Sequence, residues 1–196
     1  MKFSHDVPAR IACLISGSGR SLENLAEQIL RLDMPARIVL VISSRPGVRG
    51  LEIAETFRFP HRVISPKDHS DEESFALANW SAIRQADCDF VALLGYLSFL
   101  PIPRDYQDRV LNIHPALLPK YGGKGMYGRH VHQAVLDAGD TESGCTVHFA
   151  NNEYDAGPIL LQRRCPVLPD DTVETLAARV FEEEKKAFPA ALHTLI

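Results

Sequence analysis

The sequence predicts a single α/β domain over residues 1–196, with a mostly parallel sheet, helices on both faces and an antiparallel strand pair near the C-terminus. Short apolar runs alternate with amphipathic runs of helical period, which is typical of such a sheet. The run at 89–96 is apolar throughout, as in a parallel strand covered on both faces. Residues 144–167 hold two strand-like runs around a polar, turn-rich link, which favours a hairpin. We therefore expect a Rossmann-like sheet, in which ligands bind beyond the carboxyl ends of the strands.

The elements are expected in the order βαβαβαββαββα. Ser21 is expected to cap the first helix, and Ser70 with Glu73 to form a capping box on the third. Pro189 is expected to interrupt or bend the last helix. The predicted strands are 10–16, 37–44, 61–65, 89–96, 110–114 and the pair within 144–167, and the predicted helices are 21–32, 48–57, 70–86, 128–139 and 171–195, the last capped at Asp171 or Thr172.

Composition narrows the class of protein. The chain has 196 residues, 45% of them hydrophobic and 23% charged, as in a soluble globular protein. A net charge of −4 disfavours nucleic acid as a partner. No apolar stretch approaches the roughly 18 residues that span a bilayer, and residues 1–10 lack the apolar core of a signal peptide. We therefore expect a cytoplasmic protein without a membrane partner.

The four cysteines form no CxxC pair, and most lie in or beside apolar runs, so reduced and mostly buried thiols are expected. They are Cys13, Cys88, Cys145 and Cys165.

A glycine-rich turn, SGSGRS at 16–21, joins the first predicted strand to the first helix. Gly17 and Gly19 allow the backbone to approach an anion, the helix N-terminus offers N–H groups, and Arg20 adds a positive charge. Leu22 stands where the dinucleotide fingerprint has its third glycine, and no Walker A lysine follows. The segment predicts a site for a phosphate monoester, with a tight turn that binds no ligand as the alternative.

Two polar side chains sit at the end of the predicted strand 110–114. Asn112 and His114 are two residues apart, so they project from the same side of the strand. Asn112 can donate a hydrogen bond to a carbonyl oxygen, and His114 can move a proton near neutral pH. Asp155, in the hairpin link, could orient the imidazole. The three side chains together suit acyl transfer. The alternative is that Asn112 and His114 only make the hydrogen bonds that the start of a loop needs.

Other chemistries find less support. No GxSxG motif is present, so direct attack of a substrate amine on a bound acyl donor fits better than a covalent enzyme intermediate. His130 and His132 would face different directions on a helix, and no HExxH motif is present, so no metal is expected. The charged run 182–186 is expected to be a solvated helix face.

Three segments resemble the folate-dependent formyltransferase family: ISGSGRSLENL, LNIHPALLPKYGGKG and GCTVHFANNEYDAGPILLQ. The resemblance covers nearly the whole chain, and its nearest pattern is that of members acting in de novo purine biosynthesis. It implies transfer of a formyl group from 10-formyltetrahydrofolate, as co-substrate, to the amine of glycinamide ribonucleotide. We expect a protein that acts on small molecules, as either a monomer or a homodimer.

The resemblance also implies site residues. Asn112 would hold the formyl oxygen, His114 would be general acid and oxyanion partner, and Asp155 would sustain the charge and position of His114. The implied substrate-binding residues are Gly17, Ser18, Gly19, Arg20, Ser21, Phe181 and Glu184. The implied folate-binding residues are Leu97, Ser98, Phe99, Leu100, Asn112, Asn151, Asn152, Glu153, Tyr154 and Asp155.

Related enzymes, and the positions at which this sequence differs from the family pattern, leave alternative functions open. A deformylase-like hydrolase would use water as the acceptor, another sugar-phosphate amine could replace the ribonucleotide, and a catalytically idle binding module is a further possibility. The tRNA-formylating and deformylating relatives carry an additional domain for which this chain has no room. Ser98 stands where the family often has Arg, Arg20 stands where a small polar residue is usual, and the 122–128 loop is long enough to be a lid or a variant turn.

Overall fold

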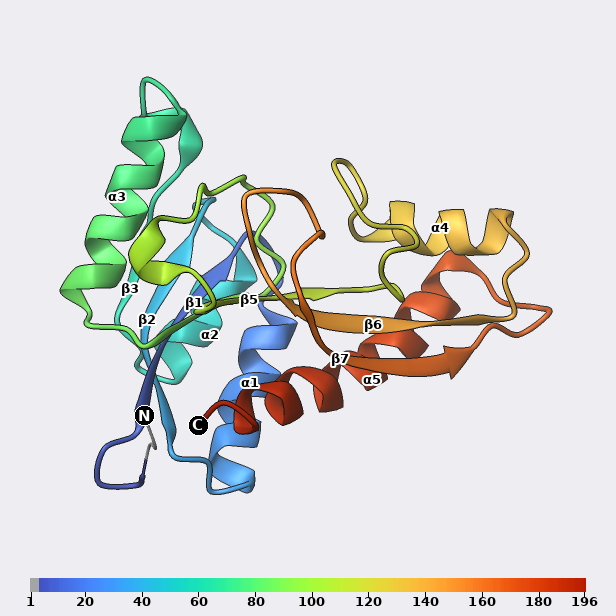
Figure 1. The fold of residues 1–196 in the computed structure, drawn as a ribbon, viewed down its shortest axis with the longest axis horizontal. Coiled ribbons are helices and arrows are strands. Elements are labelled where there is room, and N and C mark those ends of the chain that lie inside the picture. The colour runs from blue at the N-terminus through green and yellow to red at the C-terminus, as the bar shows by residue number, and fades with distance from the viewer. Residues whose placement is uncertain (1–3) are drawn as a thin grey trace. The chain divides into compact units, whose positions relative to one another are not determined.

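The computed structural model describes residues 4–196, and its elements follow the predicted order (Figure 1). The strands are β1 (Ala9–Ile15), β2 (Ala36–Ser43), β3 (His61–Val63), β4 (Phe90–Leu93), β5 (Val110–His114), β6 (Glu142–Phe149) and β7 (Ile159–Pro166). The helices are α1 (Arg20–Arg31), α2 (Arg49–Thr56), α3 (Glu72–Gln85), α4 (Arg129–Asp137) and α5 (Val173–His193), with 3₁₀ turns at Pro66–Asp68 and Arg104–Tyr106. Residues 1–3 lie outside the described residues. They begin both the predicted domain and the segment in which no signal peptide is expected.

The strands form a mostly parallel sheet in the order β3-β2-β1-β4-β5-β6-β7. β1 pairs in parallel with β2 and β4, and β2 pairs in parallel with β3. β6 and β7 pair antiparallel, from Glu142 opposite Pro166 to His148 opposite Ile159. The predicted α/β class, with its C-terminal antiparallel pair, is confirmed.

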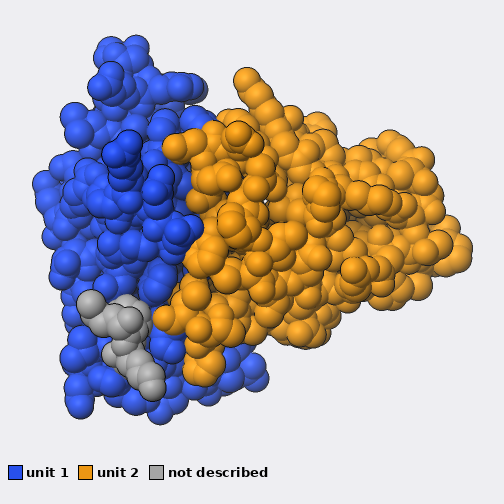
Figure 2. Space-filling model, in the orientation of Figure 1, with its two compact units in different colours: residues 1–111, 196 blue, residues 112–195 orange. Residues whose placement is uncertain are grey.

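The chain divides into two compact units, residues 1–111 with 196 and residues 112–195 (Figure 2). The boundary falls within β5, so Asn112 and His114 belong to the second unit. A single domain over 1–196 stays a prediction.

In the first unit, β1 supplies the centre of the core. Ile11, Leu14 and Ile15 are fully buried, as expected for a central parallel strand. α1 buries Leu22 and Leu25 from one face, the spacing that predicted this helix. Packing of this kind fixes where β1 ends and α1 begins, and so fixes the glycine-rich turn between them.

In the second unit, α5 packs against β6 and β7. Thr172 caps α5 by accepting from the Thr175 N–H, as the sequence predicted. The helix continues through Pro189 to His193, so the predicted interruption is wrong. Pro189 is buried together with Leu192, and this tertiary packing outweighs the backbone hydrogen bond that proline cannot make.

Two predicted helix caps are also wrong. Ser21 lies inside α1, because Gly19 adopts a left-handed conformation (φ 71°) and becomes the capping residue without any side-chain bond. α3 is capped by Asp71, whose Oδ1 accepts from the Ser74 N–H at 2.8 Å, rather than by Ser70 and Glu73. The side chains of Asp71 and Ser74 are short enough to accept from each other's backbone N–H group, so these two residues form the capping box.

No helix within residues 4–196 has the length and apolar character needed to cross a membrane.

Gly157 closes the turn before β7, and a Cβ there would lie 1.8 Å from the Phe149 carbonyl oxygen. Gly157→Ala should therefore lower the free energy of unfolding by about 1–3 kcal/mol, the usual scale of overpacking. Gly17→Ala is the matched control, because a Cβ at Gly17 meets nothing within 4 Å. Urea denaturation measures both variants, and equal stabilities would contradict this account of the turn.

Candidate active site

The end of β5 presents two polar side chains to one carboxylate. Asn112 is partly buried and His114 is 4% exposed. Both reach Asp155: Asn112 Nδ2 lies 3.3 Å from Oδ1, and His114 Nδ1 lies 3.5 Å from Oδ2. The prediction that the two side chains project to the same side of the strand is confirmed, and so is their approach to Asp155.

Asp155 lies in the link between β6 and β7, with its backbone in the left-handed region at φ 55° and its side chain 11% exposed. Its Oδ2 also accepts from the Gly123 N–H at 2.9 Å. A Cβ on Gly122 would lie 2.6 Å from Leu118 Cδ2 and 3.1 Å from the Asp155 Cβ, so glycine at this position favours the close approach of the loop to the carboxylate. Asp155 thus joins β5 to the loop at 122–128.

Sequence reasoning missed His148, which completes this cluster from β6. Its Nδ1 lies 3.0 Å from the Phe149 carbonyl oxygen, so Nδ1 carries the proton and Nε2 is an acceptor. Nε2 lies 3.1 Å from Asn112 Nδ2 and 3.6 Å from Asp155 Oδ1. A histidine within the buried run of β6 was the available signal, because such a ring needs polar partners.

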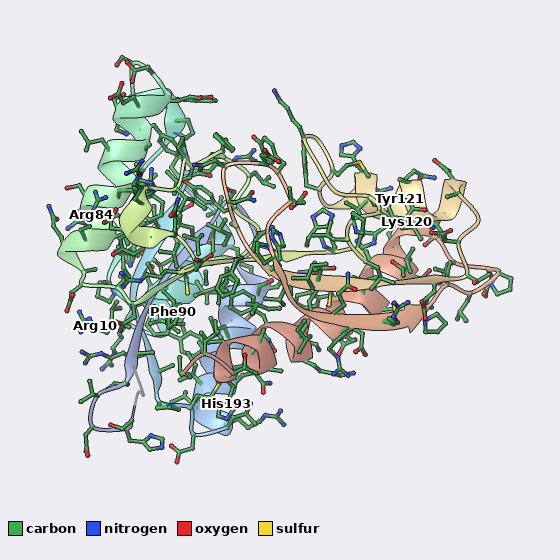
Figure 3. The ribbon with its side chains drawn as sticks, viewed as in Figure 1. Arg10, Arg84, Phe90, Lys120, Tyr121 and His193 are labelled. Carbon is green, nitrogen blue, oxygen red and sulfur yellow. The ribbon has the colours of Figure 1, made fainter. Side chains whose placement is uncertain are left out.

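Tyr121 braces His114 from the other side. Its carbonyl oxygen accepts from His114 Nε2 at 2.7 Å, which assigns a proton to that nitrogen. Figure 3 labels Tyr121 and its neighbour Lys120, which lie in the segment after β5. The Tyr121 hydroxyl donates to Asp140 Oδ2 at 2.8 Å, and Lys120 Nζ lies 3.0 Å from the same oxygen. Tyr121 is held in the left-handed region at φ 57°, so this anchor fixes the direction of its carbonyl.

Burial and charge act in opposite directions on His114. Burial lowers its pKa, while the negative charge of Asp155 and the bond to the Tyr121 carbonyl raise it, and the net pKa lies below the ordinary value. Burial raises the pKa of Asp155, but the neighbouring His148 and His114 rings and the Gly123 N–H together outweigh it, so its pKa is lowered. The cluster therefore pairs an ionised carboxylate with an imidazole that gives up its second proton readily.

A hollow of about 310 Å³ lies beside Tyr121, between the segment after β5 and the β6–β7 hairpin. None of Asn112, His114 and Asp155 lines it.

The cysteines offer no nucleophile. All four are free and buried, as predicted. Burial raises the pKa of Cys88 and of Cys145 to about 12, so these thiols keep their protons at neutral pH. Among residues 4–196, no group of three or more His, Cys, Asp or Glu side chains is placed to hold a metal ion. His130 is exposed and His132 is buried, so the two rings do face different directions.

The glycine-rich turn lies in the first unit. The first N–H groups of a helix have no carbonyl partner within it, and no side chain caps α1. Arg20 is exposed at the start of this helix. Ser16 was not predicted to matter, yet its hydroxyl lies 2.6 Å from that of Ser44 and accepts from the Leu97 N–H at 2.9 Å. It ties the ends of β1 and β2 to the segment expected to bind folate.

The other predicted site residues divide between the units. Leu97 is exposed and Leu100 is buried, both in the first unit. In the second unit, Asn151–Tyr154 form an exposed turn before Asp155. Phe181 and Glu184 lie on α5, where Lys185 Nζ is 5.8 Å from the centre of the Phe181 ring. Within the second unit, then, the structure brings together Asn112, His114 and Asp155.

Fold and cluster together define an α/β protein with a buried Asn–His–Asp centre at the end of a strand. Residues 9–192 match the formyl transferase family. A phosphoribosylglycinamide formyltransferase of Haemophilus influenzae is 36% identical over 185 residues, which is 93% of this chain and 85% of that protein. The chain belongs to the formyl transferase family.

Solved structures agree with this assignment. Glycinamide ribonucleotide transformylase 1 from Symbiobacterium toebii superposes with a TM-score of 0.90 at 34% identity, covering 98% of this chain and 88% of that one. The trifunctional purine biosynthetic protein adenosine-3 of Drosophila pseudoobscura pseudoobscura is 42% identical over 190 residues. That match covers 95% of this chain but only 14% of the trifunctional protein.

The buried histidines predict a pH dependence of stability. Burial lowers the pKa of His114 and of His132, and the nearby His114 ring lowers the pKa of His132 further. The unfolded chain, with histidine pKa values of about 6.5, then binds more protons than the folded chain. Stability should therefore fall as pH is lowered from about 7 to about 5, a window above the ordinary carboxylate pKa.

Urea denaturation across this pH range checks the sign. His132→Gln should flatten the slope, and His130→Gln, on the exposed face of the same helix, should leave it as in the wild type. A wild-type stability that is constant or rises toward pH 5 would contradict the assignment of buried, neutral rings.

Proposed function

We propose that this chain transfers a formyl group from 10-formyltetrahydrofolate to the amine of glycinamide ribonucleotide, a step of de novo purine biosynthesis. The observation that carries the proposal is the shared carboxylate of Asp155, 3.3 Å from Asn112 and 3.5 Å from His114. Its support also comes from relatives named phosphoribosylglycinamide formyltransferase, including that of Haemophilus influenzae.

The reaction needs a hydrogen-bond donor for the formyl oxygen and a group that carries a proton. It needs no covalent enzyme intermediate. The amine nitrogen attacks the formyl carbon and forms the new C–N bond, while the carbonyl oxygen takes the negative charge. The C–N bond to the folate then breaks as the intermediate collapses. The amine loses one proton, and the leaving folate nitrogen gains one.

Asn112 is suited to hold the formyl oxygen. Its two N–H groups are used within the cluster, one by His148 Nε2 at 3.1 Å and one by Asp155 Oδ1 at 3.3 Å. The formyl oxygen would replace the longer bond, to Asp155, while His148 keeps the amide in orientation. A donor held in this way stabilises an oxyanion without reorganising during the reaction.

His114 is suited to carry the proton. In its neutral form the Nε2 proton is bonded to the Tyr121 carbonyl, and Nδ1 has a lone pair facing Asp155. The ring can take the proton of the attacking amine, with Asp155 stabilising the cation, and return it to the folate nitrogen. The lowered pKa of His114 favours that return. Donation to the oxyanion would require the bond to Tyr121 to open.

The remaining residues would bind the two substrates. The turn Gly17–Ser21 would hold the ribonucleotide phosphate with backbone N–H groups and Arg20, and Glu184 with Phe181 would hold the amine end. Leu97–Leu100 and Asn151–Asp155 would contact the folate. Cytoplasmic location, a monomer or homodimer, and the absence of a metal, a membrane or a nucleic-acid partner complete the proposal.

An assay with and without the amine tests this function. Purified chain is incubated with 10-formyltetrahydrofolate and glycinamide ribonucleotide, and the formylated ribonucleotide is measured by mass spectrometry. We expect this product, and no loss of formyl folate when the amine is omitted. Loss of formyl folate without the amine would identify a hydrolase that uses water, and no reaction in either case would identify an idle binding module.

Removing the proton carrier or its carboxylate should stop turnover without unfolding the chain. His114→Gln keeps a donor near the Tyr121 carbonyl but cannot accept a proton, and Asp155→Ala removes the charge. Each should lower kcat at least about a hundredfold, the scale of acid–base and oxyanion groups. Steady-state kinetics measures this, with His130→Gln as the exposed control, and melting temperatures verify folding. Turnover like that of the wild type in both variants would remove the mechanism.

A further inference from the structure

Arg49, the first residue of α2, contacts the glycine-rich turn at 16–21. Its Nη1 donates to the Ser18 carbonyl oxygen at 3.4 Å. Its Nη2 lies 3.0 Å and 3.2 Å from the two carboxylate oxygens of Glu23, in the first turn of α1. The two side chains are 51% and 36% exposed, so solvent and small anions can reach the pair.

The backbone, and not the ion pair, fixes α2 against this turn. The Gly50 N–H donates to the Gly17 carbonyl oxygen at 3.1 Å. A Cβ on Gly19 would lie 2.5 Å from the Gly50 Cα, so both glycines are needed for this approach. Arg49 precedes Gly50, so its backbone stays beside the start of α1 and its guanidinium stays within reach of the turn when its partner changes.

Glu23 creates an electrostatic problem for a phosphate at this turn. A carboxylate in the first turn of a helix is favourable when the N-terminus is empty, because it faces the positive end of the helix dipole. It repels a phosphate monoester, which carries a charge of about −1.5 to −2 near neutral pH. Arg49 neutralises Glu23, and its guanidinium has N–H groups beyond those that contact Ser18 and Glu23.

We propose that Arg49 is a specificity-determining residue for the phosphate of the acceptor, exchanging its ion pair with Glu23 for a phosphate oxygen when the acceptor binds. Glu23 then competes with the phosphate for Arg49. Its carboxylate stabilises the turn when no ligand is bound, and it makes binding selective for a doubly charged group. The inference rests on the proposed function and adds to it a guanidinium, besides that of Arg20, supplied by α2.

The two partners of the pair predict effects of opposite sign. Arg49→Gln should weaken binding of ribose 5-phosphate about 5–20-fold, the scale of one charge-assisted bond to an anion. Glu23→Gln should tighten binding about 2–5-fold, because an exposed charge contributes less than about 1 kcal/mol. A purely structural brace would make both variants weaker, since either change breaks the same contact.

Chemical-shift titration of the amide resonances of Gly17 and Gly19 with ribose 5-phosphate measures these dissociation constants without any turnover. Arg31→Gln and Glu27→Gln, on exposed positions of the same helix α1, are the charge-matched controls and should bind within about twofold of the wild type. The KM for glycinamide ribonucleotide should follow the same order, with the KM for the folate unchanged.

An unchanged dissociation constant in Arg49→Gln, or weaker binding in Glu23→Gln, would overturn the inference. If the wild-type chain forms formylated ribonucleotide and Arg49→Gln has the same KM for glycinamide ribonucleotide, the inference is wrong and the proposed function stands. A wild-type chain that binds ribose 5-phosphate with the predicted order, but forms no product, would keep the role of Arg49 and remove the proposed acceptor.

Discussion

The carboxylate of Asp155 is the constraint on which the rest of the candidate active site depends. Its two oxygens face Asn112 and His114 from β5, the Gly123 N–H from the loop, and His148 from β6. Burial of a carboxylate is unfavourable, and the N–H groups of Asn112 and Gly123, together with the positive charge that the His114 ring can take up, offset that cost so that Asp155 stays ionised. One buried charge thereby sets the orientation of an amide donor and of a proton carrier.

The support of this charge extends beyond the residues that would touch a substrate. The segment Tyr121–Gly123 contacts His114 through a carbonyl and Asp155 through an N–H, and Asp140 anchors it through the Tyr121 hydroxyl. His148 in turn holds the amide of Asn112. Preorganisation of this kind lets a site stabilise developing charge without moving its own dipoles, and it explains why the loop after β5 matters even where it carries no catalytic side chain.

Much of the fold and the centre of the site could be predicted from the sequence, because both leave a pattern in residue types. Apolar runs located most of the strands, although the short β3 is exposed, and the two-residue spacing of Asn112 and His114 predicted their shared side. Backbone groups leave no such pattern, so the Tyr121 carbonyl and the Gly123 N–H were missed. The cap of α1 was misassigned for the same reason, since the conformation of Gly19 and not the side chain of Ser21 decides it. The roles of Phe181, Glu184 and Leu97–Leu100 stay predictions.

The central claim is that the charge of Asp155 controls the protonation of His114, and an NMR titration of the His114 ring tests it most directly. The pKa of His114 is measured in the wild type and in Asp155→Asn, which keeps the shape of the side chain and removes its charge. Because that charge raises a pKa that burial lowers, the account predicts a lower His114 pKa in Asp155→Asn. An unchanged or higher pKa would contradict it.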